Sequence, residues 1–136
     1  MSVMDLDAIS SRTLEQLDGE VWPEPNVTDT GLVRECHRLR RVPVGNLTVG
    51  DLRELIGQRI GIEWLVPFAL GHLEQDPLAG ELYPGDLLNA VLRCDPVYWN
   101  ENLTQLMSLW RVRDALQQLQ TKSSKFLARP DWPSFE

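Results

Sequence analysis

The stretch from Leu47 to Arg93 holds most of the strongly apolar sequence, and the rest of the chain is expected to pack around it. Thr48, followed three residues later by Asp51, has the spacing of a helix N-cap in a variant of the capping box. An amphipathic helix is therefore predicted to begin at Thr48, and Gly61 suits its C-terminal stop. Its buried face is marked by apolar residues at helical spacing, namely Leu52, Leu55, Ile56 and Ile60.

A second run, from Ile62 to Leu73, is apolar on nearly every side and is predicted to be the buried central helix. Pro67 lacks a backbone donor and crowds the carbonyl of Glu63, so a kink or a restart is expected there. The run is too short and too interrupted to cross a membrane, which requires roughly 20 apolar residues. No membrane partner is expected.

A third helix follows, in which Pro84 fits position N1 and Asp86 lies in the first turn, where the helix dipole favours an acid. These three helices are predicted to share one core. The residues expected to be buried together are Leu55, Ile56, Leu65, Leu70, Leu88 and Val91.

The flanking segments add shorter elements. Leu14 to Gly19 indicates one helical turn, and Val21 to Asn26 is a proline-restricted extended segment that Trp22 can anchor on the core. Gly31 to Arg41 carries apolar residues at helical spacing, namely Leu32, Val33, Cys36 and Leu39. After the capping pair Asp95 and Pro96, one long helix or two successive ones are expected, fraying after Gln120.

No segment alternates convincingly between apolar and polar residues, so the predicted fold class is all-α. We expect a single compact domain of about five or six helices around a buried central helix. Residues 1–12 are predicted to be a flexible N-terminus, residues 13–120 the helical domain, and residues 121–136 a tail that docks through Phe126 or Trp132.

The net charge of the chain limits the classes of partner that it can bind. The 136 residues include 13 Lys plus Arg and 20 Asp plus Glu, which gives a formal net charge of −7. A nucleic-acid-binding protein needs the opposite sign, so direct nucleic-acid binding is not expected. The first residues lack both the positive start and the apolar core of a signal peptide, which predicts a cytoplasmic protein.

The search for catalytic chemistry finds no catalytic, cofactor-binding or metal-binding set. Cys36 is next to His37, but neighbours on a helix point about 100° apart and do not form a nucleophile and base pair by themselves. Cys94 with His72 is a conceivable dyad. Two cysteines without metal-ligand spacing are more simply interpreted as reduced, partly buried thiols.

Acidic residues are distributed unevenly. Between Arg59 and Arg93 there is no Lys or Arg, and residues 1–29 contain seven acids against Arg12 alone. One interpretation is a solubilising surface, and the other is a surface that binds a basic partner. The acids inside the basic-free interval are candidate contacts: Glu63, Glu74, Asp76, Glu81 and Asp86.

The segment from about Thr13 to Trp99 resembles a family of small α-helical immunity proteins from bacterial contact-dependent growth inhibition systems. The motifs that carry the resemblance are CHRLRR at Cys36 to Arg41, LTVGDLRELIGQ at Leu47 to Gln58 and DPLAGELYPGDLL at Asp76 to Leu88. The resemblance implies a non-enzymatic antitoxin that acts in the cytosol of the producing cell. It would bind, as a monomer and one to one, the C-terminal toxin domain delivered by a sibling cell.

Such toxins are often nucleases with basic clefts, which an acidic inhibitor could cover. Two alternatives remain open: an acidic helical scaffold or adaptor, and a small thiol-dependent hydrolase that uses Cys36 or Cys94.

Overall fold

The computed structural model describes residues 5–119 together with residues 132 and 133. These residues form eight α-helices and one 3₁₀-helix with no strand, so the all-α prediction is confirmed. In chain order the elements are α1 (Leu6–Ile9), α2 (Leu14–Asp18), α3 (Gly31–Leu39), η1 (Val44–Asn46), α4 (Val49–Gly57), α5 (Ile62–Gln75), α6 (Asp86–Leu92), α7 (Pro96–Glu101) and α8 (Leu103–Gln118).

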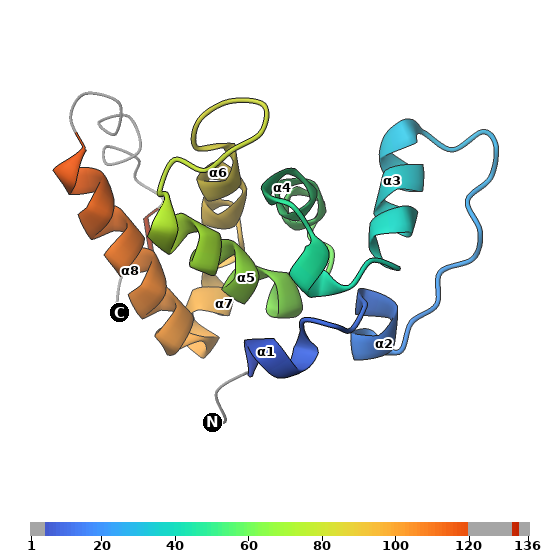
Figure 1. Cartoon of the computed structure of the whole chain (residues 1–136), viewed down its shortest axis with the longest axis horizontal. Coiled ribbons are helices and arrows are strands. Elements are labelled where there is room, and N and C mark those ends of the chain that lie inside the picture. Colours follow the sequence, from blue (N-terminus) through green and yellow to red (C-terminus); the bar gives the residue numbers. More distant parts are fainter. Residues whose placement is uncertain (1–4, 120–131, 134–136) are drawn as a thin grey trace.

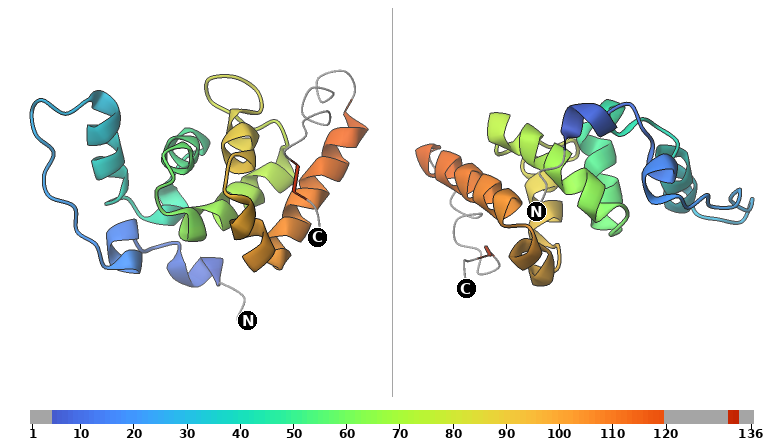
Figure 2. Two further views of the ribbon diagram at one scale, coloured as in Figure 1. Left: turned by 180° about the vertical axis from the view of Figure 1, so that it is seen from behind. Right: turned by 90° about the horizontal axis from the view of Figure 1, so that it is seen from below.

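Along the long axis of the molecule α8 lies at one end and α3 at the other, while α1 lies below the middle (Figure 1). Helix α5 lies between them and packs against α4, α6 and α8, while α4 also packs against α6 and α3. Seen from below, α3 and the loop that precedes it stand out from the other helices (Figure 2). Helices α2 and α3, with the segment between them, therefore form one end of the molecule.

Helix α5 supplies the centre of the core. Leu65 has no exposed surface, and all six residues predicted to be buried together belong to one apolar cluster, so this prediction is confirmed. Helix α5 is continuous across Pro67, so a restart does not occur there. The buried side chains of α5 are Leu65, Val66, Ala69, Leu70 and Leu73.

The capping box of α4 is confirmed. The Thr48 hydroxyl accepts from the Asp51 N–H at 3.1 Å, and the Asp51 carboxylate accepts from the Thr48 N–H at 3.0 Å. The predicted stop at Gly61 is wrong, because α4 ends at Gly57 and the left-handed residue behind it is Arg59, with φ of 59°. Gly61 instead is the left-handed N-cap of α5, where a Cβ would lie 2.8 Å from a methyl group of Leu14.

Asp86 lies in the first turn of α6 as predicted, but the expected position of Pro84 needs correction. Pro84 precedes the helix, which begins at Asp86 after Gly85, whose φ is 88°. The reason is that the Gly85 N–H donates to the Leu78 carbonyl at 2.9 Å, so the chain is still turning at these residues.

The segment after Asp95 forms two helices, α7 and α8, which is one of the two outcomes expected there. Trp132 packs against the core, and its ring lies 5.9 Å from the Arg113 guanidinium on α8. Trp132 therefore packs on the core as predicted, whereas Phe126 lies outside the described residues.

The N-terminal residues join the core through backbone contacts. Within residues 1–12, expected to be flexible, the structure has the one-turn helix α1, and the carbonyls of Ser10 and Arg12 accept from Gly45 and Val44 at 2.8 Å. The flexibility of this segment stays a prediction. Trp22 packs on the core as expected, with its ring 5.0 Å from that of His37.

Candidate protein-binding site

Asp86, one of the five acids predicted as contacts, has a buried carboxylate. The residue is only 2% exposed, and its carboxylate accepts from the backbone N–H groups of Glu81 at 3.2 Å and Leu82 at 2.8 Å. Arg53 on α4 lies 3.6 Å from the same carboxylate. The loop before α6 thus wraps around Asp86, so this residue shapes the loop.

Glu81 is exposed and comes to lie against α4. A Cβ atom on Gly50 would occupy the position of the Glu81 carboxylate, at 1.4 Å from its Oε2. Glycine at position 50 therefore permits the close approach. The approach brings Glu81 to the first turn of α4, next to the capping acid Asp51.

The other three predicted acids lie elsewhere. Glu74 forms an ion pair with Arg111 of α8 at 2.5 Å, and exposed Asp76 accepts from the Leu78 N–H at 3.1 Å. Glu63 is exposed in the first turn of α5, and the rise along a helix separates it from Glu74 by about 16 Å. The five acids predicted from the basic-free interval therefore do not form one patch.

The structure reveals an acidic face that the sequence analysis missed, where α3, α4 and the loop before α6 meet. We define it as Glu35, Asp51, Glu54 and Glu81. Burial is the main factor that raises the pKa of Glu54 above its ordinary value; the neighbouring carboxylates, Glu35 foremost, add to the rise, and Arg53 opposes it. Two of these acids come from α4, but Glu35 and Glu81 join them only through packing between elements.

Arg38 neutralises one member of the acidic face. Its guanidinium donates to both carboxylate oxygens of Glu35, at 3.0 and 2.5 Å, and these hydrogen bonds lower the pKa of Glu35. In contrast, no salt bridge reaches Glu54 or Glu81 from any described residue. The unpaired charge of the face is therefore concentrated on α4 and the loop.

A pocket of about 290 Å³ opens beside Glu54, with walls from α3, α4, α6 and the loop before α6. Leu32 and Tyr83 form an apolar rim, 40% and 47% exposed, and the Tyr83 hydroxyl accepts from Asn89 at 3.0 Å. Leu32 was expected on the inward face of its helix, but the N-terminal turn of α3 leaves it half uncovered. The lining residues are Leu32, Arg53, Glu54, Gly57, Gln58, Tyr83, Asp86, Asn89, Ala90 and Arg93.

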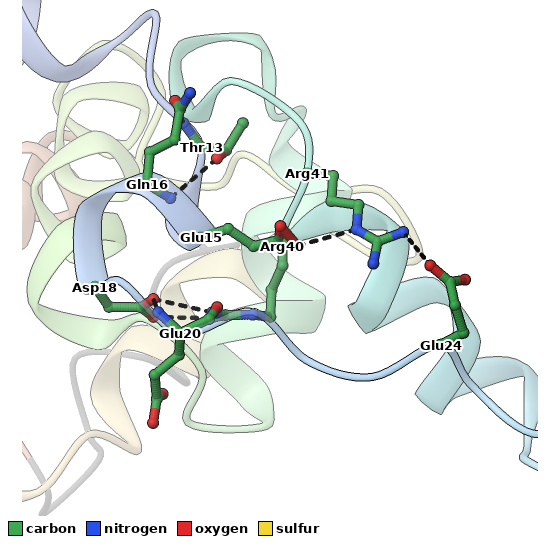
Figure 3. A network of polar contacts seen from close by, with 8 residues as sticks. All are labelled: Thr13, Glu15, Gln16, Asp18, Glu20, Glu24, Arg40 and Arg41. Carbon is green, nitrogen blue, oxygen red and sulfur yellow. Dashed lines mark hydrogen bonds and ion pairs between the residues drawn. The ribbon is translucent and has the colours of Figure 1, made fainter.

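The acids of the N-terminal segment serve mainly in internal contacts (Figure 3). Arg40, 2% exposed, donates to the Asp18 carboxylate at 2.9 and 3.0 Å and to the Glu20 carbonyl at 2.5 Å. Hydrogen bonds from Arg40 are the main factor that lowers the pKa of Asp18. Arg41 binds Glu15 at 3.0 Å and Glu24 at 2.9 Å. This network attaches the extended segment to the end of α3.

The two thiols are buried and unactivated. Burial raises the pKa of Cys94 to about 11, and burial together with Glu54 and Glu35 raises the pKa of Cys36. A nucleophilic thiol needs the opposite shift of its pKa.

The described residues contain no group of three or more His, Cys, Asp or Glu that could hold a metal ion. Nor does any helix in the described part of the chain have the length and apolar character to cross a membrane.

Fold and site together describe a small all-α protein with an acidic face beside a half-open pocket. The chain belongs to the family of CDI immunity proteins, where CDI denotes contact-dependent growth inhibition, and the match covers residues 16–109. The match includes the whole acidic face and every residue that lines the pocket. It supports an immunity role for the chain. A comparison with curated proteins finds no match.

Proposed function

We propose that the chain is an antitoxin that binds the C-terminal toxin domain of a CDI effector in the cytosol of the producing cell and neutralises it one to one. The observation that carries this proposal is the family match over residues 16–109. The proposal includes no catalytic step by the chain itself, and the raised pKa of Cys94, about 11, gives the thiol-hydrolase alternative no support.

We further propose that the toxin is a nuclease and that the chain covers its basic cleft. A surface that binds phosphates must be basic, and the net charge of −7 on this chain is complementary to it. Four of the originally predicted contacts remain candidates because they are exposed: Glu63, Glu74, Asp76 and Glu81. For Asp86 we propose an indirect role, since it holds the loop that carries Glu81.

Co-expression with the toxin domain encoded in the adjacent reading frame tests the proposal directly. Cells that produce both proteins should grow, and the purified pair should form a one-to-one complex. Growth arrest despite folded, abundant chain, with no complex, would contradict the proposal. An adaptor would also lack a toxin gene as its neighbour.

A charge swap tests the electrostatic part. Asp76→Lys with Glu81→Lys changes the net charge from −7 to −3, because each swap adds two charges. Exposed charges mainly speed encounter, so association should slow and depend less on salt, while dissociation changes less. The matched control is Glu20→Lys with Glu101→Lys, which are also exposed and also leave −3. Equal effects from both pairs would show that net charge, and not the position of the acids, matters.

A further inference from the structure

The pocket between α3, α4 and α6 has room that none of the described residues fills. Gly57, at the end of α4, lines it, and a Cβ atom at this position would meet nothing within 4 Å. The volume of about 290 Å³ is just below the range of about 300–1,000 Å³ for pockets that hold small molecules. A pocket of this size suits an inserted side chain of a protein partner.

The charges in the pocket leave one carboxylate available. Asp86 is already engaged by Arg53 and by the backbone of its loop. Glu54 has no salt-bridge partner among the described residues, and it lies close to three other carboxylates, which disfavour its charge. Two cations also line the pocket: Arg53 on α4, which lies 3.6 Å from the Asp86 carboxylate, and Arg93 at the C-cap of α6.

The rim supplies the apolar part of the pocket's surface. Leu32 and Tyr83 are large side chains that line the pocket and are nearly half exposed. Arginine and tyrosine are enriched at the energetic centres of protein interfaces, where an anchor side chain fills a pocket and its neighbours exclude water. The long methylene stem of a basic residue packs on apolar surface while its charged head reaches a carboxylate.

We infer that this pocket receives an arginine or lysine side chain of the toxin domain, with its cationic head at Glu54 and its stem between Leu32 and Tyr83. This inference rests on the proposed function and adds the contact that anchors the complex. The acids on the surrounding face then attract the basic partner from a distance, and the pocket holds it.

Filling the pocket is the sharpest test. Gly57→Phe places a ring in unoccupied space, so the fold should be retained, and replacing a helical glycine should leave the melting temperature equal or higher. The Kd for the cognate toxin domain should rise by about 30-fold or more, the factor expected for a hot spot. Gly71→Phe is the matched control: residue 71 is exposed on α5, its Cβ would also meet nothing within 4 Å, and it does not line the pocket.

The cationic occupant is tested by Glu54→Gln, with Glu101→Gln as the control on α7. The first variant should raise the Kd by about tenfold through faster dissociation, since a desolvated contact is lost, and the second should not. If wild type binds and both Gly57→Phe and Glu54→Gln leave the Kd unchanged, the inference is wrong and the proposed function stands.

Two further outcomes overturn the inference. If only Gly57→Phe weakens binding, or if Gly71→Phe weakens it equally, the pocket does not hold a cation. If the wild-type chain itself fails to bind the toxin domain, the proposed function fails and the inference fails with it.

Discussion

The N-terminal region of the molecule and its helical centre are held together by different forces. Residues 5–41 contribute only Leu14, Cys36 and Leu39 to the buried apolar cluster. Polar contacts of Arg40 and Arg41 hold this region together internally, because their partners Asp18, Glu15 and Glu24 belong to it as well. Helices α4, α5, α6 and α8 instead interlock through apolar side chains.

Because of this difference, pH and salt should destabilise the two regions to different extents. Apolar burial is insensitive to pH and screening, whereas paired charges weaken when acid protonates a carboxylate or when salt screens it. The acidic face lies where the two regions meet, on α3 and α4. Substitutions confined to one region should therefore affect either the stability of the apolar core or the position of the acidic face, but not both.

The largest expected effect comes from Leu65→Ala in the centre of α5. The side chain has no exposed surface, so its truncation leaves a cavity and should cost about 2–5 kcal/mol of the free energy of unfolding. Denaturant titration measures it, with exposed Leu82→Ala as the control, for which less than about 0.5 kcal/mol is expected. A cost under about 1 kcal/mol for Leu65→Ala would remove α5 from its central place.

Asp18→Ala should give the next largest effect, about 3 kcal/mol, because it leaves the buried Arg40 charge without its partner. The pKa of Asp18 is lowered in the folded protein, so its contribution is present above the ordinary value of 3.8 and is lost as pH falls through the lowered pKa. Acid unfolding curves should therefore be flatter for the variant in that range.

A double variant sharpens the same comparison. Asp18→Ala with Arg40→Met removes both charges and leaves an apolar stem against Trp22, so it should be more stable than Asp18→Ala alone. A double variant that is less stable than the single one would show that Arg40 contributes chiefly through its hydrogen bond to the Glu20 carbonyl.

The apolar region was the more predictable of the two. Periodicity alone identified the common core of α4, α5 and α6, because burial repeats along each helix, and the Thr48 and Asp51 box follows from local spacing. Local signals failed where tertiary contacts set the geometry. Pro84 has the character of an N1 residue, but the loop wraps around Asp86 and the helix begins later.

The candidate site was less predictable for the same physical reason. A gap in basic residues along the sequence identifies acids but not their neighbours in space, so it grouped Glu63 with Glu74 although they lie at opposite ends of α5. Glu54 was overlooked because Arg53 and Arg59 flank it in the sequence. The pocket itself depends on how α3, α4 and α6 pack, which no single helix pattern contains.

The junction between α4 and α5 offers a smaller, stabilising change. Arg59 is left-handed, and the N–H groups of Arg59 and Ile60 donate to the carbonyls of Ile56 and Leu55 at 2.9 Å, as in a Schellman motif. Glycine adopts this conformation without strain, so Arg59→Gly should raise the free energy of unfolding by about 1 kcal/mol. Arg59→Ala also removes the charge but keeps the strain, so a similar gain from alanine would contradict this explanation.

The smallest expected effect, at the boundary of the two regions, is that of Glu54→Gln on stability. The pKa of Glu54 is raised in the folded protein, chiefly by burial and then by Glu35, so the ionised side chain costs stability. Below the ordinary pKa of 4.5 both the folded and the unfolded state are protonated, and the variant should gain nothing. As pH rises through the raised pKa, wild type should lose stability relative to the variant, by less than about 1 kcal/mol at neutral pH because the group is partly solvated.

The effect of Glu54→Gln on stability should be opposite in direction to its effect on toxin binding. If Glu54 holds a cation of the toxin domain, Glu54→Gln should unfold at a slightly higher temperature at pH 7 and yet release the toxin faster. The stability gain should disappear near pH 4, which thermal melts at several pH values can measure in the absence of toxin. A variant that is less stable at neutral pH would mean that Glu54 has a stabilising partner, and its carboxylate would then not be available at the boundary between α3 and α4.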